Sequence, residues 1–258
     1  MPSDPLKLCS FLLDRCKALG VHVHHPATAL CIATDVRDEL ASVRIGYTDS
    51  SAETEIPCTR LLLSAGAWTP SVFKALFPES GLRIPVSSLA GHSLVVNAPG
   101  VLEEAEGVRC HSVYCDLGDL APEVYARREG VIYIAGVNSS AIPLPDVATA
   151  AEPQEDSIGQ LLDVAKQVIK GQDETALEVV REGLCFRPVT ARGTPIITRI
   201  GDEHLGGGVT TRPGSDGGVF VATGHGPWGI SLSLGTGKVM AEMMQGRDMS
   251  ADISALGL

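Results

Sequence analysis

The sequence predicts a mixed α/β (α+β) fold. Apolar residues recur at helical spacing over Leu8–Leu19 and again over Ile230–Met244. Between them, short alternating segments such as Val131–Val137 are separated by Gly and Pro, a pattern typical of an antiparallel sheet. A chain of 258 residues with 44% hydrophobic residues can bury one large core or two small ones.

The first half of the chain begins with a helix that Gly20 ends, because glycine readily takes the left-handed conformation after a last helical turn. A later apolar run breaks at Gly66, and a proline suited to a first helical turn follows. In order, we expect a helix over Leu8–Leu19, strands over Val21–His25, Ala29–Thr34, Ser42–Tyr47 and Arg60–Ser64, and a helix over Pro70–Leu76.

The second half alternates more densely and carries more Gly and Pro. A stretch rich in Pro, Ala and acidic residues, Ala141–Glu155, is interpreted as a loop. We expect strands over Ser93–Asn97, Glu123–Arg127 and Val131–Val137, a helix over Ser157–Ile169, strands over Ala176–Arg181, Cys185–Val189, Ile196–Ile200 and Val219–Thr223, and a helix over Ile230–Met244.

Composition excludes several classes of partner. The chain has 20 Lys+Arg against 31 Asp+Glu, a net charge of −11, and no basic block, so no nucleic-acid partner is expected. No apolar run approaches the roughly 20 residues that span a bilayer, so no membrane partner is expected. The charged, amphipathic N-terminal stretch does not resemble a signal peptide, and the seven cysteines are scattered. These features predict a cytoplasmic protein with reduced thiols.

Two glycine-bearing bends are the most informative feature of the sequence. Gly224, Gly226 and Gly229 form G-x-G-x-x-G between a strand and a helix. A dinucleotide fingerprint would need a second strand after that helix, and the chain ends too soon for one. Ser64–Trp68 is a second strand-to-helix bend of the same kind. We expect both bends to contact one extended ligand with an electron-rich group.

Other patterns near the bends are interpreted as structural. Gly235-Thr236-Gly237-Lys238 lacks the spacing of a P-loop, so the two glycines are expected to allow close helix packing. His22 and His24 would share one face of a strand, with His25 beside them. Two imidazoles without an acidic or cysteine partner make a poor metal site, so no metal is predicted.

Three segments resemble the family of FAD-dependent amine and amino-acid oxidases, the group of D-amino-acid, glycine and sarcosine oxidases. Leu62–Thr69 is similar to the "AAGAWS" bend, Cys185–Ile197 to the "RPVTPDGLPIIG" segment, and Val219–Gly237 to the C-terminal "ATGHGxxGI…ATG" element. Pro122–Tyr125 and Ser250–Ile253 resemble a fungal-type branch of oxidoreductases in that family.

The resemblance implies an incomplete FAD/NAD(P)-binding-type layer, formed by residues 1–83 and 191–258, and a substrate domain with an antiparallel sheet, formed by residues 84–190. Members of the family begin with a βαβ unit that holds the FAD pyrophosphate, and this chain begins after what would correspond to it. The resemblance therefore implies a truncated enzyme with FAD as cofactor and an amine or amino acid as substrate.

Site roles carried over by the resemblance fall into two groups. Arg187 matches an arginine that binds the substrate carboxylate, with a structural salt bridge as its alternative. Tyr125 matches a tyrosine that hydrogen-bonds the substrate, with a plain sheet aromatic as its alternative. Cys185 matches a site of covalent flavin attachment in some members, but we expect it to be buried as a small hydrophobe. The implied FAD contacts are Ala29, Gly66, Ala67, Trp68, Gly224, His225, Gly226, Gly229 and Ile230.

The implied reaction is oxidation of a C–N bond by hydride transfer to the flavin. No catalytic residue is assigned, because hydride transfer from a neutral amine needs little acid–base help. The alternative is a non-catalytic remnant of the same family, a binding module unable to hold FAD alone. Substrate identity, electron acceptor and oligomeric state are left open by these residues.

Overall fold

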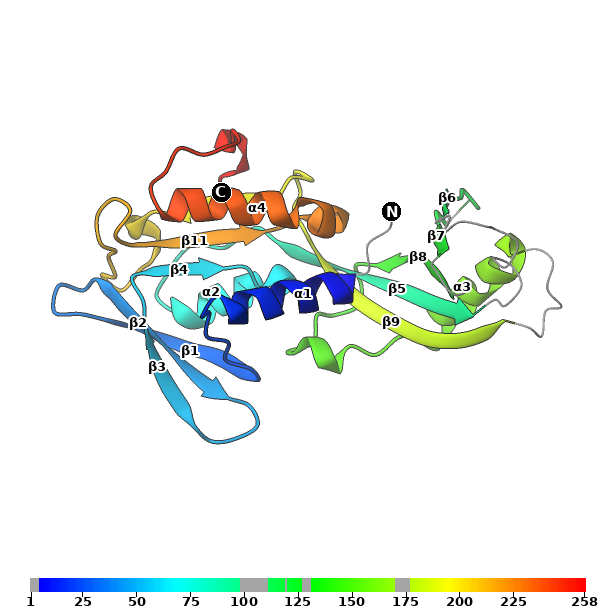
Figure 1. Ribbon diagram of the computed structural model, residues 1–258, viewed down its shortest axis with the longest axis horizontal. Coiled ribbons are helices and arrows are strands. Elements are labelled where there is room, and N and C mark those ends of the chain that lie inside the picture. Colours follow the sequence, from blue (N-terminus) through cyan, green and yellow to red (C-terminus); the bar gives the residue numbers. More distant parts are fainter. Residues whose placement is uncertain (1–4, 98–110, 119, 127–130, 170–176) are drawn as a thin grey trace. The chain divides into compact units, whose positions relative to one another are not determined.

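The computed structural model describes residues 5–97, 111–118, 120–126, 131–169 and 177–258 (Figure 1). It confirms a mixed α/β fold with antiparallel and mixed sheets. The chain divides into two compact units, one of Met1–Cys9 and Ser88–Phe186, the other of Ser10–Ser87 and Arg187–Leu258. Among the described residues, every helix is too short or too polar to cross a bilayer.

The first helix, α1 (Pro5–Ala18), has no buried residue, and Gly20 follows it with a φ of +83°. The prediction of a strand over Val21–His25 is wrong. This segment is exposed and irregular, and it ends at Pro26, which has no N–H to donate to a sheet. Its alternating valines therefore bury no face, and its histidines do not share a strand.

A three-stranded antiparallel sheet follows, formed by β1 (Ala27–Thr34), β2 (Leu40–Tyr47) and β3 (Glu53–Pro57) in that order. The sequence analysis missed β3. Only Thr54 and Ile56 of β3 are half-buried, and only Ile56 of these is apolar, so the strand has a weak apolar pattern. The sheet packs against the main core of its unit, in which Leu40 and Val43 are buried.

The sheet that positions the site has the order β10–β11–β4, with β4 covering Arg60–Leu63, β10 covering Ile196–Ile200 and β11 covering Gly218–Thr223. β11 runs parallel to β4 and antiparallel to β10. Two helices cover it, α2 (Thr69–Leu76) and α4 (Gly229–Met244), and α4 lies along β11 in Figure 1.

Both faces of β11 are buried, which explains its run of apolar residues from Val219 to Ala222. Val219 and Val221 join the core that contains Phe73 of α2. Phe220 faces the other way, into a smaller cluster with Met240 of α4. The central strand is therefore held from two sides, so its carboxyl end has a fixed place in this unit.

The other unit is built on a five-stranded sheet of order β6–β7–β8–β5–β9. Helix α3 (Glu155–Val168) covers one face, where Leu161 packs against Leu94 and Ile134. The strands are β5 (Ser87–Asn97), β6 (Ser112–Tyr114), β7 (Glu123–Ala126), β8 (Val131–Ser139) and β9 (Glu178–Val189).

Two predicted strands near the end of this sheet are one. β9 runs without a break from Glu178 to Val189. Gly183, which lies between the two predicted strands, does not end it, because this glycine allows a close approach to β5, where a Cβ would lie 2.8 Å from Ser93 Oγ. Ala176 and Arg127, predicted as strand residues, lie outside the described part of the chain. Short 3₁₀ helices occur at Gly66–Trp68, Ala148–Ala150, Asp202–His204, Gly226–Trp228 and Ser254–Leu256.

Candidate functional site

The two glycine-bearing bends lie side by side. β4 and β11 are parallel neighbours, and Leu63 is paired with Val221, so both strands end at the same edge of the sheet. A hydrogen bond joins the bends directly, because the Thr223 hydroxyl donates to the carbonyl of Gly66 at 2.8 Å. The structure therefore brings together two segments that are about 160 residues apart in sequence.

Each bend is built in the same way. Gly66 and Gly226 have φ values of +55° and +54°, a left-handed conformation that glycine adopts without a steric penalty. Each glycine opens a short 3₁₀ turn that ends at a tryptophan and continues into α2 or α4. The leading N–H groups of a helix have no acceptor within the helix, and its N-terminus carries partial positive charge. Two such ends at one sheet edge suit an electron-rich or anionic group.

The backbone is open where these glycines lie. A Cβ placed on Gly66 would meet no described atom within 4 Å, and one on Gly226 would meet only Val189 Cγ1, at 4.0 Å. Gly224 differs, because a Cβ there would lie 2.6 Å from Thr190 Cγ2. Gly66 and Gly226 thus leave room for a ligand beside the main chain, whereas Gly224 is needed for packing within the protein.

His225 is held by a residue that sequence analysis did not single out. Its Nε2 lies 3.0 Å from the hydroxyl of Thr236, in the second turn of α4. The ring is half-buried, and this burial lowers the pKa of His225, which favours the neutral imidazole. An i to i+11 contact across a bend leaves no periodic signal in the sequence, so only the fold could show it.

Gly235 and Gly237, on either side of Thr236, do not serve close helix packing as predicted. A Cβ on either glycine would meet no described atom within 4 Å. The start of α4 is exposed, because this part of the helix extends away from the buried cluster around Met240. Exposed apolar side chains there are Trp228, Ile230, Leu232 and Leu234.

Ala29, the weakest of the predicted cofactor contacts, lies on β1 and packs against the main core of its unit. It is not one of the residues at the bends. Arg187 lies on β9, two residues before Val189, whose side chain is nearest to Gly226. Alternation along a strand places Arg187 and Val189 on the same face of β9.

Tyr125, the other predicted substrate residue, lies on β7 in the unit with the five-stranded sheet. Its hydroxyl donates to Glu123 Oε2 at 2.9 Å and lies 3.1 Å from the hydroxyl of Tyr114. Its ring is 6.1 Å from that of Tyr133, its cross-strand partner. Burial, together with these hydrogen bonds, raises the pKa of Tyr125 well above its ordinary value. Val124 packs under α3, so Tyr125 lies on the opposite face.

Cys185 and the histidines differ from the sequence interpretation. Cys185 is exposed, not buried, because it lies on the opposite face of β9 from the buried Phe186, and its Sγ lies 3.5 Å from the Gly91 carbonyl. His24 Nδ1 lies 2.7 Å from the Tyr47 hydroxyl. In the described ranges, no three His, Cys, Asp or Glu side chains come together as metal ligands would.

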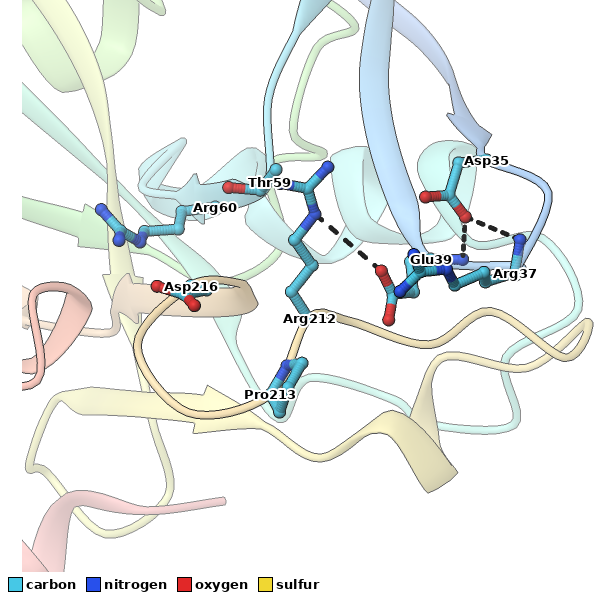
Figure 2. A pocket seen from close by; sticks show the side chains of 8 residues that line it. All are labelled: Asp35, Arg37, Glu39, Thr59, Arg60, Arg212, Pro213 and Asp216. Atoms are coloured by element: carbon cyan, nitrogen blue, oxygen red, sulfur yellow. Dashed lines mark hydrogen bonds and ion pairs between the residues drawn. The ribbon is translucent and has the colours of Figure 1, made fainter.

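A cavity of about 630 Å³ lies at the opposite end of the same sheet, where β4 and β11 begin (Figure 2). Its lining carries three arginines and three carboxylates, so its formal charges balance. The Arg212 Nε faces Glu39 Oε2 at 3.9 Å, and backbone N–H bonds, chiefly from Arg37, lower the pKa of Asp35. The cavity is lined by Asp35, Arg37, Glu39, Thr59, Arg60, Arg212, Pro213 and Asp216.

Comparison with known proteins identifies the family of this chain. The family model of FAD-dependent oxidoreductases, DAO, matches residues 2–243. The "Putative oxidoreductase C1F5.03c" of Schizosaccharomyces pombe is 30% identical over 226 residues, 87% of this chain and 51% of that protein. A D-amino acid dehydrogenase of Methylobacterium radiotolerans is 25% identical over 249 residues, 94% of this chain and 49% of that protein.

Solved structures show the same fold. Glycine oxidase from Geobacillus kaustophilus has a TM-score of 0.66 at 19% identity, covering 94% of this chain and 54% of that one. L-proline dehydrogenase from P. horikoshii has a TM-score of 0.72 at 12% identity, covering 99% of this chain and 59% of that one. This chain spans about half the length of the curated relatives it matches. It belongs to the DAO family of FAD-dependent oxidoreductases, whose cofactor is FAD.

Proposed function

We propose that the paired bends bind FAD and that the enzyme to which this chain belongs oxidises the C–N bond of an amine or amino acid. The observation that carries the proposal is the hydrogen bond from Thr223 to Gly66, which joins the bends at one edge of the sheet. The residues fit the cofactor, because Gly66 and Gly226 leave open backbone beside two helix N-termini.

In this assignment the two bends contact different parts of the cofactor. The segment around Gly66, Ala67 and Trp68 would contact the adenosine and pyrophosphate side, where backbone N–H groups can donate to phosphate oxygens. The segment from Gly224 to Ile230 would face the flavin ring, where N–H donors stabilise negative charge. When bound, FAD supplies a two-electron acceptor for a hydride.

Substrate binding is assigned to Arg187 and Tyr125. Arg187 shares a strand face with Val189, which borders the Gly226 bend, and a guanidinium can bind a carboxylate through two parallel hydrogen bonds. Tyr125 would contribute a hydroxyl from the five-stranded sheet. Several relatives are named for amino-acid substrates, which supports an amino acid as the substrate class.

The proposed roles are distributed over the two compact units. The unit of Ser10–Ser87 and Arg187–Leu258 contains both bends, so we assign it to cofactor binding. That unit also contains Arg187, and the unit that contains Ser88–Phe186 carries Tyr125, so a residue assigned to the substrate lies in each.

Anaerobic mixing of the FAD-loaded protein with amines and with D- and L-amino acids tests the reaction. We expect loss of the visible flavin absorption with one of these classes, and less of it in Arg187→Lys, which keeps the charge but not the planar fork. If FAD is bound and no amine or amino acid reduces it, the proposed reaction is wrong even though the cofactor assignment holds.

A binding module without catalysis is the second candidate, and the exposed start of α4 favours it. Trp228 is 62% exposed, and three apolar residues after it in α4 are exposed as well. Monomeric proteins seldom leave such a patch uncovered. Under this alternative the isolated chain would bind a hydrophobic dye at the α4 surface and would not take up FAD.

A further inference from the structure

We propose that Thr236 is a positioning residue that fixes the imidazole of His225, and through it the conformation of the bend from Gly224 to Gly229. The inference rests on the proposed function, in that this bend is the one assigned to the flavin ring. The observation behind it is the 3.0 Å contact between His225 Nε2 and the Thr236 hydroxyl.

Ordering this bend costs more backbone entropy than ordering an average segment, because it contains two glycines beside His225. His225 stands between Gly224 and Gly226, which have φ values of +77° and +54°. Glycine loses more conformational freedom on ordering than any other residue, so a segment with two of them is costly to hold in one state. The bond from the Trp228 N–H to the His225 carbonyl closes one local turn only. The contact with Thr236 ties the bend to the body of α4.

Thr236 differs in burial from its neighbours in α4. Residues 230–235 and 237–238 of α4 are exposed, and Thr236 alone in that stretch is half-buried. Its neighbours Gly235 and Gly237 have open space where a side chain would lie. The hydroxyl is therefore placed by the helix for its bond to His225 and not for a place in the core.

The small residue at position 229 fits the same arrangement. A Cβ on Gly229 would lie 3.8 Å from the Cβ of His225, so the histidine lies over the first residue of α4. The ring then reaches along the helix to Thr236. Burial favours its neutral form, in which one ring nitrogen donates and the other accepts. The contact between Nε2 and the Thr236 hydroxyl fixes one ring orientation, and because a hydroxyl can donate or accept, it can form with either neutral tautomer.

The test compares Thr236→Val with Thr236→Ser in the full chain. Thr236→Val keeps the shape and removes the hydroxyl, whereas Thr236→Ser keeps it. Ser233→Ala is the matched control, because it removes a hydroxyl from the same exposed part of α4 whose bond is to the Ile230 carbonyl. Imidazole nitrogen NMR signals of His225, identified with His225→Gln, are recorded without FAD, and FAD affinity is measured by fluorescence titration.

We expect Thr236→Val to shift the nitrogen signals of the His225 ring, which loses its hydrogen-bond partner, and to weaken FAD binding about fivefold, the effect of one lost hydrogen bond. Thr236→Ser and Ser233→Ala should match the parent in both measurements. Unchanged His225 signals in Thr236→Val would overturn the inference, and so would shifted signals with unchanged FAD affinity. If neither the parent nor any variant binds FAD, the proposed function fails. The NMR signals of His225 in Thr236→Val then still decide whether Thr236 fixes the ring.

Discussion

At the scale of single residues, the glycines divide into those that make room for a ligand and those that the protein itself needs. Gly66 has a left-handed backbone and open space beside it, whereas Gly224 packs against Thr190. The sequence motif marked both bends, but it could not separate these roles. Gly235 shows why. A glycine looks the same in the sequence whether its missing side chain permits a close contact, as at Gly224, or leaves open space, as at Gly235.

A pair of alanine substitutions tests this division. Gly224→Ala should lower the free energy of unfolding by about 2 kcal/mol or more, because φ is +77° and the new Cβ would lie 2.6 Å from Thr190 Cγ2. Gly235→Ala should raise it by about 0.5–1 kcal/mol, since alanine favours an exposed helix interior. Urea unfolding followed by circular dichroism measures both, and equal effects would contradict the assignment.

A buried histidine makes the stability of the unit that contains Ser88–Phe186 depend on pH. His92 on β5 is 1% exposed, and its Nε2 accepts the Gln154 N–H at 3.2 Å at the start of α3. Burial lowers the pKa of His92, partly offset by the backbone of Val137. Below its ordinary value of 6.5 the unfolded chain therefore binds more protons than the folded one, so this contribution to stability is present above that pH and lost as the pH falls.

His92→Gln removes the titration and keeps a group able to accept from the Gln154 N–H. Between about pH 7.5 and about pH 5.5, the parent should lose more unfolding free energy than this variant. Denaturant titrations at the two pH values supply the comparison. A parent and variant with the same pH slope would show that His92 titrates alike in the folded and unfolded chain.

At the scale of elements, the sequence predicted the strands and helices whose apolar pattern is decided by burial. β11 was predicted because it is apolar from Val219 to Ala222, as expected of a strand buried on both faces. Val21–His25 has a strand-like pattern but no partner strand, and β3 has partners but few apolar residues. Strand pairing depends on tertiary contacts. Local alternation therefore failed to predict β3 and wrongly predicted a strand over Val21–His25.

Two valine-to-alanine changes measure how much the buried strand contributes. Val221→Ala on β11 removes two fully buried methyl groups and should cost about 2 kcal/mol of unfolding free energy. Val36 is fully exposed in the β1–β2 hairpin, and Val36→Ala should change the free energy of unfolding by less than about 0.5 kcal/mol. Comparable losses in the two variants, by thermal or urea unfolding, would mean that β11 is not a core strand.

At the scale of the whole molecule, the site depends on the pairing of β4 with β11. Two bends far apart in sequence meet because parallel strands end at one edge of a sheet. The sequence supported that expectation through two like motifs, since each motif is a strand that ends in glycine before a helix. It could not supply the bond from Thr223 to Gly66, the contact of His225 with Thr236, or the exposure of Cys185, all of which depend on how distant segments pack.

Titration of the chain with FAD, with Gly66→Val beside Gly235→Ala, tests the central claim most directly. Both substitutions add a side chain where the protein leaves open space, but only Gly66 lies at the joined bends. We predict saturable quenching of flavin fluorescence for the parent and for Gly235→Ala, and affinity at least tenfold weaker for Gly66→Val, about 1.4 kcal/mol. Folded Gly66→Val that binds FAD as tightly as the parent, or a parent that shows no saturable binding, would contradict the account.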